Sequence, residues 1–293
     1  MTDDAQMRKD FKARVNERHA LVIPGTGDAL GGRLIRNARF EAAYMSGFAV
    51  EGTHAFPDIG FLGMSEMAGR AAEIAQACEL PLLCDCDTGY GGVLNVRRTV
   101  REFERAGVAA IQFEDQELPK KCGSLGGKRL VSVEEMTGKI RAAVDARHDP
   151  NLLVIGRTDA VAVEGMDRAL ERMQAYAEAG ADLLMILGPY RREDIPRIAK
   201  SATRPFVYLN SESLTMPMVP VAELTALGLH IAVFPLSLLL AATRAMERTL
   251  ESLRDSGTTL DVMDETMTSW SRFNDLMDLP KLQAFEAGHT PRA

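Results

Sequence analysis

The stretch RAGVAAI at residues 105–111 ends a helical pattern at a glycine and continues at once into apolar residues. The same arrangement occurs in EAGADLL at residues 178–184 and in LGLHI at residues 227–231. Glycine at such a position adopts the left-handed conformation that ends a helix, so each stretch predicts a helix followed directly by a buried strand. Repetition of this junction is typical of helices that alternate with parallel strands.

Eight short apolar stretches along the chain have the length and composition of strands. They are Ala20–Ile23, Ala42–Met45, Leu82–Asp85, Ala109–Phe113, Leu152–Ile155, Asp182–Ile186, Pro205–Leu209 and His230–Phe234. Apolar residues at helical spacing lie between them, as in Val93, Val96, Val100 and Phe103, and in Met136, Ile140, Ala143 and Val144 after a capping box of Ser132 and Glu135. Eight strand–helix units without a break in composition predict an α/β protein with one (β/α)8 barrel, a TIM barrel.

Two segments lie outside the eight units, and both are expected to be helical. Residues 1–18 form a charged N-terminal helix, residues 19–250 the barrel, and residues 256–293 a C-terminal extension, all within one domain, 1–293. The extension has an apolar face between Phe273 and Phe285. An apolar face must be buried, either on another subunit or on its own barrel, and the sequence leaves both alternatives open.

The composition narrows the classes of function. The chain has 293 residues, 46% of them hydrophobic, a formal net charge of -7 and a pI of about 5.4. An acidic surface argues against nucleic acid or an anionic membrane as the partner. No secretory signal and no apolar run long enough for a bilayer are visible, and four cysteines make no disulfide framework, so we expect a cytoplasmic protein.

Acidic residues stand at the expected ends of neighbouring strands, where the active sites of barrels lie. Asp85 and Asp87 are two residues apart and share one face of a strand, and Glu114 ends the next strand. Carboxylates that point into one small mouth repel each other unless a cation lies between them, and oxygen ligands favour Mg²⁺. The alternative is that these acids cap helices or pair with arginines, but several at adjacent strand ends favour the metal.

A glycine-rich, basic segment at residues 118–129 follows the fourth strand and is predicted to be a loop over the barrel mouth. It contains Cys122 next to Lys120 and Lys121. Flanking lysines are expected to lower the pKa of the thiol and to suit it to proton transfer. An incidental surface cysteine is the alternative.

Six motifs in this order resemble the isocitrate lyase/phosphoenolpyruvate mutase superfamily over roughly residues 15–290. They are YMSG at 44–47, PDIG at 57–60, DCDTGYG at 85–91, EDQ at 114–116, PKKCG at 119–123 and RTDA at 157–160. The KKCG stretch resembles the branch that contains methylisocitrate lyase, dimethylmalate lyase and carboxyphosphonoenolpyruvate mutase.

The resemblance implies a helix-swapped barrel in a dimer of dimers, hence a homotetramer, that acts on a small carboxylic acid. It implies a Mg²⁺ site, with Mn²⁺ as a substitute, near Asp58, Asp85, Asp87 and Glu114. It implies that Cys122 protonates an enolate, that Arg157 steadies the enolate oxygen, and that Tyr44 belongs to the catalytic set. It implies that the substrate is bound by the backbone of Ser46 and Gly47 and by Lys121, Gly123, Ser124, Asn210 and Glu212.

The sequence departs from the tricarboxylate lyases at the positions that contact substrate in the family. Ser124 replaces the usual histidine, Leu187 falls where a glutamate is usual at the end of the sixth strand, and Asn210-Ser211-Glu212 is a shortened form of the usual motif. The leading hypothesis is a carbon–carbon lyase that cleaves a substituted malate or a methylisocitrate-like acid to a 2-oxo acid and a second carboxylate.

Three other functions are considered. An oxaloacetate decarboxylase or hydrolase of the same superfamily is the runner-up, since the apolar Leu187 suits a smaller substrate. Cys122 disfavours a phosphonate mutase of the cysteine-free kind. A non-catalytic barrel that senses an organic acid would need no proton donor, so the acidic cluster together with Cys122 disfavours it.

Overall fold

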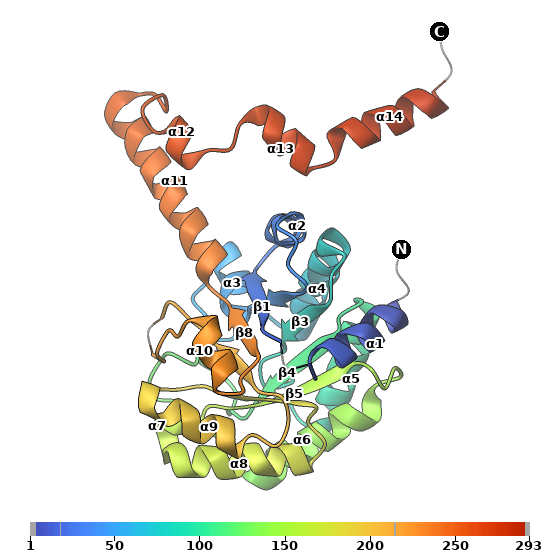
Figure 1. Cartoon of the computed structure of the whole chain (residues 1–293), viewed down its shortest axis with the longest axis vertical. Helices are drawn as coiled ribbons and strands as arrows, with labels where there is room; N and C mark the ends of the chain where they lie inside the picture. Colours follow the sequence, from blue (N-terminus) through green and yellow to red (C-terminus); the bar gives the residue numbers. More distant parts are fainter. Residues whose placement is uncertain (1–3, 18, 214, 291–293) are drawn as a thin grey trace. The chain divides into compact units, whose positions relative to one another are not determined.

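Eight parallel strands form the centre of the computed structural model (Figure 1). They are β1 (Leu21–Thr26), β2 (Ala43–Met45), β3 (Leu82–Asp85), β4 (Ala110–Glu114), β5 (Leu153–Thr158), β6 (Leu183–Ile186), β7 (Val207–Leu209) and β8 (Ile231–Phe234). Each predicted strand is confirmed, with ends that differ by at most three residues. The larger differences are at β1 and β5, which continue into Thr26 and Thr158, because polar residues at the mouth still extend the ladder.

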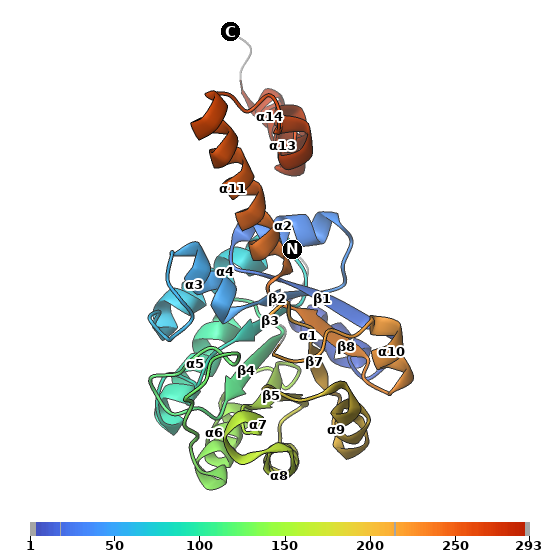
Figure 2. The same ribbon diagram turned by 90° about the vertical axis from the view of Figure 1, so that its left-hand side faces the viewer.

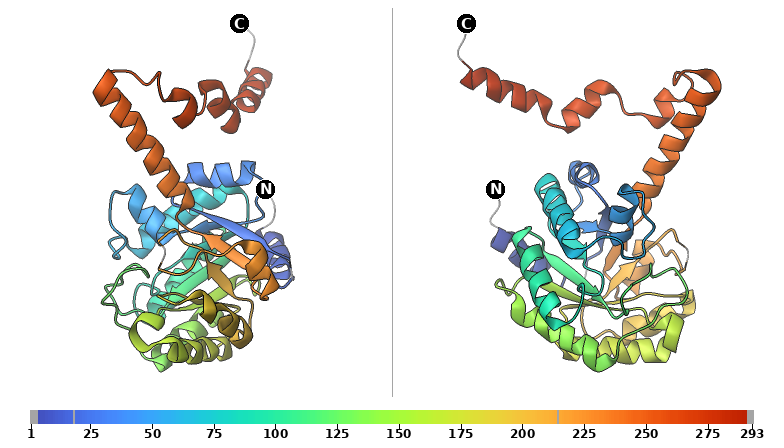
Figure 3. Two further views of the ribbon diagram at one scale, coloured as in Figure 1. Left: turned by 60° about the vertical axis from the view of Figure 1, so that its left-hand side comes forward. Right: turned by 180° about the vertical axis from the view of Figure 1, so that it is seen from behind.

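The strands pair in the order β6-β5-β4-β3-β2-β1-β8-β7. The two ends of this order meet at a parallel bridge between Leu184 and Phe206, where the Leu184 N–H donates to Pro205 O at 3.1 Å. The sheet therefore closes into a barrel, as predicted. Figure 2 shows the strands with helices outside them, and the two views in Figure 3 show the same arrangement from other sides.

The structure describes residues 4–17, 19–213 and 215–290. The chain divides into two units, Met1–Leu238 and Leu239–Ala293. The first unit holds the barrel and the helices α1 (Asp4–Arg14), α2 (Ala29–Asn37), α3 (Gly47–Thr53), α4 (Met64–Cys78), α5 (Val93–Arg105), α6 (Val133–Ala146), α7 (Val161–Glu164), α8 (Met166–Glu178), η1 (Arg192–Asp194), α9 (Ile195–Ser201) and α10 (Val221–Ala226). Helix α11 (Ser237–Ser256) begins at the end of the first unit, and α12 (Met263–Thr266), α13 (Trp270–Leu276) and α14 (Leu279–His289) complete the second.

The division places most of α11 in the second unit, whereas the sequence set the limit of the barrel at residue 250. The expected N-terminal helix is present as α1, and residues 1–3 and 18 of its predicted range lie outside the described residues. Arg8 attaches α1 to the first unit, since its guanidinium donates to Val108 O at 2.8 Å and to Glu104 O at 2.7 Å. No helix in the described ranges has the length and apolar character needed to cross a bilayer.

Glycine ends the helices before β4, β6 and β8, as the repeated junction predicts. Gly107, Gly180 and Gly228 have φ angles of 83°, 105° and 88°, in the left-handed region where a side chain would be strained. Each helix therefore ends at this junction, and four residues separate its last residue from the first residue of the buried strand. The carboxyl ends of all strands consequently meet at one mouth of the barrel.

Helical spacing correctly identified the faces that cover the barrel. On α5, Val96, Val100 and Phe103 are fully buried, although Val93 in the first turn is 47% exposed. Helix α6 begins after Ser132, whose side chain accepts a hydrogen bond from Glu135 N at 3.1 Å. These helix faces shield the outer side of the strands from water, so the polar side chains of the candidate site lie at the mouth of the barrel.

Candidate active site

The predicted polar residues at the strand ends lie together at the barrel mouth. Asp85 ends β3 and Glu114 ends β4, and in the β4–β5 ladder Glu114 is paired with Arg157. Asp87 follows β3 directly and Asp58 belongs to the segment between α3 and α4. All five residues are at most 8% exposed, so their charges interact through protein and not through bulk water.

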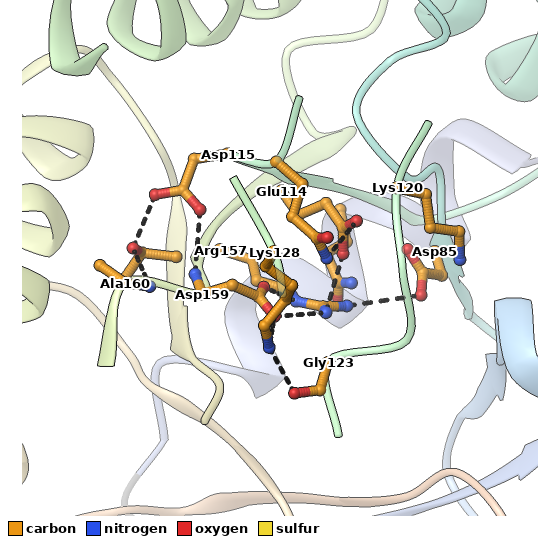
Figure 4. A network of polar contacts seen from close by, with 12 residues as sticks. Asp85, Glu114, Asp115, Lys120, Gly123, Lys128, Arg157, Asp159 and Ala160 are labelled. Carbon is orange, nitrogen blue, oxygen red and sulfur yellow. Dashed lines mark hydrogen bonds and ion pairs between the residues drawn. The ribbon is translucent and has the colours of Figure 1, made fainter. Parts of the chain in front are cut away.

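Arg157 is the central cation of the mouth (Figure 4). Its guanidinium lies 2.8 Å from Glu114 Oε2, 2.8 Å from Asp159 Oδ2 and 3.6 Å from Asp85 Oδ2. Burial lowers the pKa of Arg157, but the three carboxylates raise it by more, so the side chain stays charged. Burial raises the pKa of Glu114 well above its usual value, and Arg157 only partly opposes that shift.

Lys120 is a second cation, contributed by the 118–129 loop. Its ammonium group contacts the Asp58 carboxylate and lies 2.7 Å from Asp87 Oδ1. The Asp87 contact is an ion pair without a well-directed hydrogen bond, because Oδ1 has no hydrogen-bond partner by geometry. Burial raises the pKa of Asp87 to about 6, and Asp85 adds to the rise while Lys120 opposes it. Asp87 also has φ of 48°, a strained conformation for a residue other than glycine.

Lys128 is the third cation and ties the loop to the opposite wall. Its ammonium group lies 2.9 Å from Asp159 Oδ1 and donates to Gly123 O. Asp159 is itself fixed from below by Asp115, which accepts from the Asp159 N–H at 2.9 Å and from Thr158 Oγ1 at 2.6 Å. The loop is therefore held over the mouth by ion pairs at two separate points.

The mouth carries more negative than positive charge. Five buried carboxylates, Asp58, Asp85, Asp87, Glu114 and Asp159, share the three cations Lys120, Lys128 and Arg157. The formal surplus is two negative charges, which one divalent cation would balance. The raised pKa values of Asp87 and Glu114 have the same cause, since both carboxylates are buried with too little positive charge.

The predicted metal ligands do not converge on one point. Within the described ranges, no three His, Cys, Asp or Glu side chains form a group that could hold a metal ion. The physical reason is that Lys120 and Arg157 lie between the carboxylates and draw them apart. The donor set still fits a hard cation, because Mg²⁺ takes only one or two carboxylates and completes its shell with water and substrate oxygens.

The structure overturns one prediction about Cys122. Burial and, second to it, the Asp58 carboxylate together raise the pKa of its thiol to about 11, so the predicted lowering is wrong. The neighbouring ammonium groups are engaged elsewhere: that of Lys120 with Asp58 and Asp87, and that of Lys121 with Gly127 O at 3.0 Å. The thiol is consequently protonated at neutral pH, which is the form that donates a proton.

The predicted substrate-binding loop residues lie at the seam between the loop and the barrel. Ser124 Oγ donates to Ser213 Oγ, beyond β7, at 2.9 Å. A Cβ on Gly123 would lie 2.1 Å from Leu187 Cδ2, so a residue with a side chain there would displace Leu187. Leu187 thus packs against the backbone next to Cys122. Lys121 is directed away, towards Gly127, and faces no carboxylate of the mouth.

The N-terminus of α3 lies beside the carboxylates. A Cβ on Gly47 would be 3.3 Å from Asp85 Oδ2. The Ser46 N–H donates to Thr26 O, which leaves the Gly47 N–H as the backbone donor for a ligand at this point. Tyr44 is buried below and donates to Gln112 Oε1 at 3.1 Å. Burial raises the pKa of Tyr44 well above 10, so its hydroxyl is a donor at every working pH.

Asn210 and Glu212 are occupied by protein partners. The Asn210 amide donates to Val219 O at 2.7 Å and accepts from Val219 N at 3.0 Å, so its two ends close a turn after β7. One Glu212 oxygen accepts from Ser237 Oγ, and the other is buried without a hydrogen bond. Asn210 therefore has a structural partner at each polar atom, and only Glu212 keeps an oxygen for another group.

Sequence reasoning missed four residues that hold the site together. Lys120 and Lys128 were assigned only to a basic loop, since nothing in their spacing shows which acids they reach. Asp159 could have been found, because it follows Arg157 by two residues and so shares its face of the strand. Glu51 on α3 is also buried at the site, and its neighbours in sequence give no signal of that.

Comparison with known proteins bears on this geometry. The family model described as phosphoenolpyruvate phosphomutase matches residues 11–254. The chain is 43% identical to 2,3-dimethylmalate lyase of Eubacterium barkeri over 98% of both chains, and 40% identical to 2-methylisocitrate lyase of Aeropyrum pernix over 90% of this chain and 84% of the relative. A solved structure of phosphonopyruvate hydrolase with oxalate and Mg²⁺ superposes with a TM-score of 0.87 at 29% identity, over 97% of this chain and 99% of that one.

Proposed function

The chain belongs to the phosphoenolpyruvate mutase/isocitrate lyase superfamily and is a carbon–carbon lyase, and on this premise we propose that it cleaves a malate with alkyl branches, such as 2,3-dimethylmalate. Breaking the bond between the two central carbons of that acid yields pyruvate and propionate. The runner-up is hydrolysis or decarboxylation of oxaloacetate, which the apolar Leu187 also suits.

Leu187 is the observation that carries the choice of substrate. It lies at the carboxyl end of β6, 5% exposed, against Gly123 and next to the catalytic loop. A third carboxylate of a tricarboxylic acid needs a cation or several N–H donors there. The cations of the described mouth, Lys120, Lys128 and Arg157, are each already paired with acids. An alkyl branch instead gains free energy when it leaves water for contact with Leu187.

We propose that a divalent cation, Mg²⁺ or Mn²⁺, binds at the barrel mouth, where the carboxylates outnumber the cationic side chains. Asp85 and Asp87 would hold it, and Asp58 and Glu114 would act nearby, partly through water. When bound, the cation would neutralise charge that develops on the oxygens of a 2-hydroxy acid. The 2.7 Å ion pair between Lys120 and Asp87 implies that the Lys120 ammonium and such a cation compete for the same carboxylate.

The protein's own groups have distinct roles in the proposed reaction. The Gly47 N–H holds the substrate carboxylate, and Arg157, fixed by Glu114 and Asp159, stabilises the oxygen that becomes an enolate. Tyr44 remains a neutral hydrogen-bond donor below them. The 2-hydroxyl passes its proton to a carboxylate of the mouth, a role that suits Glu114 with its raised pKa, and becomes the 2-oxo group. The electron pair of the broken carbon–carbon bond goes to the carbon of the departing acid. The Cys122 thiol supplies the proton that this carbon needs, and the closed loop excludes water from the site.

Assembly and location complete the proposal. Large apolar side chains of the second unit are exposed, among them Trp270, Phe273, Leu282 and Phe285. Burial of such a surface against further copies would give a dimer or, as the resemblance implies, a helix-swapped tetramer. All four cysteines are free, which suits a reducing cytoplasm.

The experiment that tests the substrate is product release over a panel of acids. Pyruvate is followed for each acid, and oxalate in addition for oxaloacetate, because hydrolysis of oxaloacetate gives oxalate and acetate and no pyruvate. The panel contains 2,3-dimethylmalate, methylisocitrate and oxaloacetate, each assayed with Mg²⁺. We expect the largest kcat/KM for dimethylmalate, and a loss of at least about tenfold for that substrate in Leu187→Glu, which places a charge against the alkyl branch. Val163→Glu adds the same charge on α7, where Val163 is 46% exposed, and serves as the control. A larger kcat/KM for methylisocitrate than for dimethylmalate in the wild type would contradict the proposal.

A further inference from the structure

Glu51 is a buried carboxylate that the reaction described above does not use. It lies on α3, four residues after Gly47, and is 2% exposed. Within the described residues no cationic side chain pairs with it. Its two oxygens instead accept three backbone N–H groups of the segment that follows Asp58: Ile59 at 3.0 Å, Phe61 at 2.9 Å and Leu62 at 3.4 Å. A buried charge whose partners are all backbone amides is a strong conformational constraint on that backbone.

The main chain of Glu51 adds to the constraint. Its carbonyl oxygen accepts from the N–H groups of His54 and Phe56, both at 3.0 Å. The turn that leaves α3 and the segment that carries Asp58 are therefore both fixed by one residue.

The segment at residues 58–62 is in turn the surface on which the catalytic loop lies. The Cys122 N–H donates to the backbone oxygen of Asp58 at 2.9 Å. The Lys120 ammonium contacts the Asp58 carboxylate, and the Lys120 side chain packs on Gly60, where a Cβ would lie 3.4 Å from Lys120 Cγ. Each contact connects a loop residue to a residue next to the amides that Glu51 binds.

We propose that Glu51 is a positioning residue that sets the place of the Cys122 thiol by fixing the Asp58 segment. The proposal rests on the proposed function only in treating Cys122 as the proton donor. The helix that begins beside the substrate end of the site thus also fixes, one turn later, the surface that holds the acid. Helix α3 consequently fixes both the position of the substrate and the position of the proton donor.

Glu51→Gln tests the proposal because it keeps one oxygen for Phe61 and Leu62 but places an NH2 group against the Ile59 N–H. The loss of one charge-assisted hydrogen bond next to Asp58 is expected to raise the alkylation rate of Cys122 by iodoacetamide about tenfold. It is expected to lower kcat on the lyase substrate by a similar factor, roughly tenfold, with KM changed little. Mass spectrometry follows all four cysteines at fixed pH, and Cys78, Cys84 and Cys86, all fully buried, report any general loosening.

Glu66→Gln is the matched control, since among the described residues the exposed Glu66 carboxylate accepts only the Gly63 N–H, at 2.8 Å, at the far end of the same segment. If Glu51→Gln does not fold, Glu51→Asp is measured instead, because its carboxylate is one methylene too short to reach all three amides. The proposal is overturned if Cys122 alkylation and kcat both stay within twofold of wild type. It is also overturned if all four cysteines become reactive together, or if Glu66→Gln has the same effect. The alkylation result needs no substrate, so it decides the matter even if lyase activity is absent.

Discussion

Replacement of Cys122 by serine tests the assignment of the proton donor. The hydroxyl is slightly smaller than the thiol and keeps the backbone hydrogen bond from the Cys122 N–H to Asp58 O, which holds the loop residue in place. The substitution changes chiefly the acidity of the donor. Any loss of turnover therefore reports on proton transfer and not on the position of the loop.

The magnitude follows from the burial of the thiol. Its pKa is raised to about 11, and a serine hydroxyl is a weaker acid still, by several pKa units. If about half of this difference is expressed in the transition state, kcat falls by roughly 10²–10³, within the usual range of general acid catalysis. A thiol with a pKa near 7 would have given a larger loss, so the size of the effect also tests the pKa.

The assay is pyruvate release from dimethylmalate under saturating Mg²⁺, with KM measured alongside kcat. We expect KM to change by less than about threefold, because the Gly47 and Arg157 contacts are unaltered. Cys78→Ala, which removes a buried thiol on α4, is the control. A kcat for Cys122→Ser within threefold of wild type would remove the thiol from the mechanism.

The other predictions concern the metal, pH, stability and assembly. EDTA should abolish activity and Mg²⁺ or Mn²⁺ should restore it, so full activity of the chelated protein would contradict the metal site. The pKa of Asp87 is raised to about 6, so its carboxylate is available to a cation only above that pH, and kcat/KM should fall as pH drops through about 6. At higher pH, kcat/KM should stay level up to pH 10, because the Cys122 thiol keeps its proton until about pH 11. The same raised pKa means that ionised Asp87 destabilises the fold above pH 6, so Asp87→Asn should raise Tm at pH 8 in EDTA while it abolishes activity; an unchanged or lower Tm would speak against this. Light scattering at micromolar concentration should give a dimer or tetramer, and a monomer would refute the proposed assembly.

The barrel could be predicted from the sequence because its signals are local and repeated. Each strand is a short apolar run, and Gly107, Gly180 and Gly228 mark the helix ends with a conformation that other residues adopt at a cost. The ends of β1 and β5 were placed too early, because Thr26 and Thr158 are polar yet remain in the ladder. A polar residue at a barrel mouth therefore indicates a functional site and does not mark the end of a strand.

The site was predictable in its residues but not in its electrostatics. Asp85, Asp87, Glu114 and Arg157 stand at strand ends, so topology alone brings them together. The pKa of Cys122 could not be predicted, since adjacency to Lys120 in sequence says nothing about which acid the ammonium group reaches. Burial then decides the sign of the shift, and burial of a loop depends on contacts with segments far away along the chain, as between Cys122 and Asp58.

Two of the three cations in the mouth, Lys120 and Lys128, belong to the 118–129 loop, and only Arg157 belongs to the barrel. We propose that this loop opens to admit a substrate. Opening the entrance therefore withdraws two positive charges and leaves the five carboxylates with a single counterion. An entrance so charged repels a dianionic acid and attracts a metal ion from solution. We expect compulsory ordered addition, in which the ion enters first, the acid follows it, and the lysines return last. An acid offered to the metal-free protein should then bind only weakly, however well it fits the pocket.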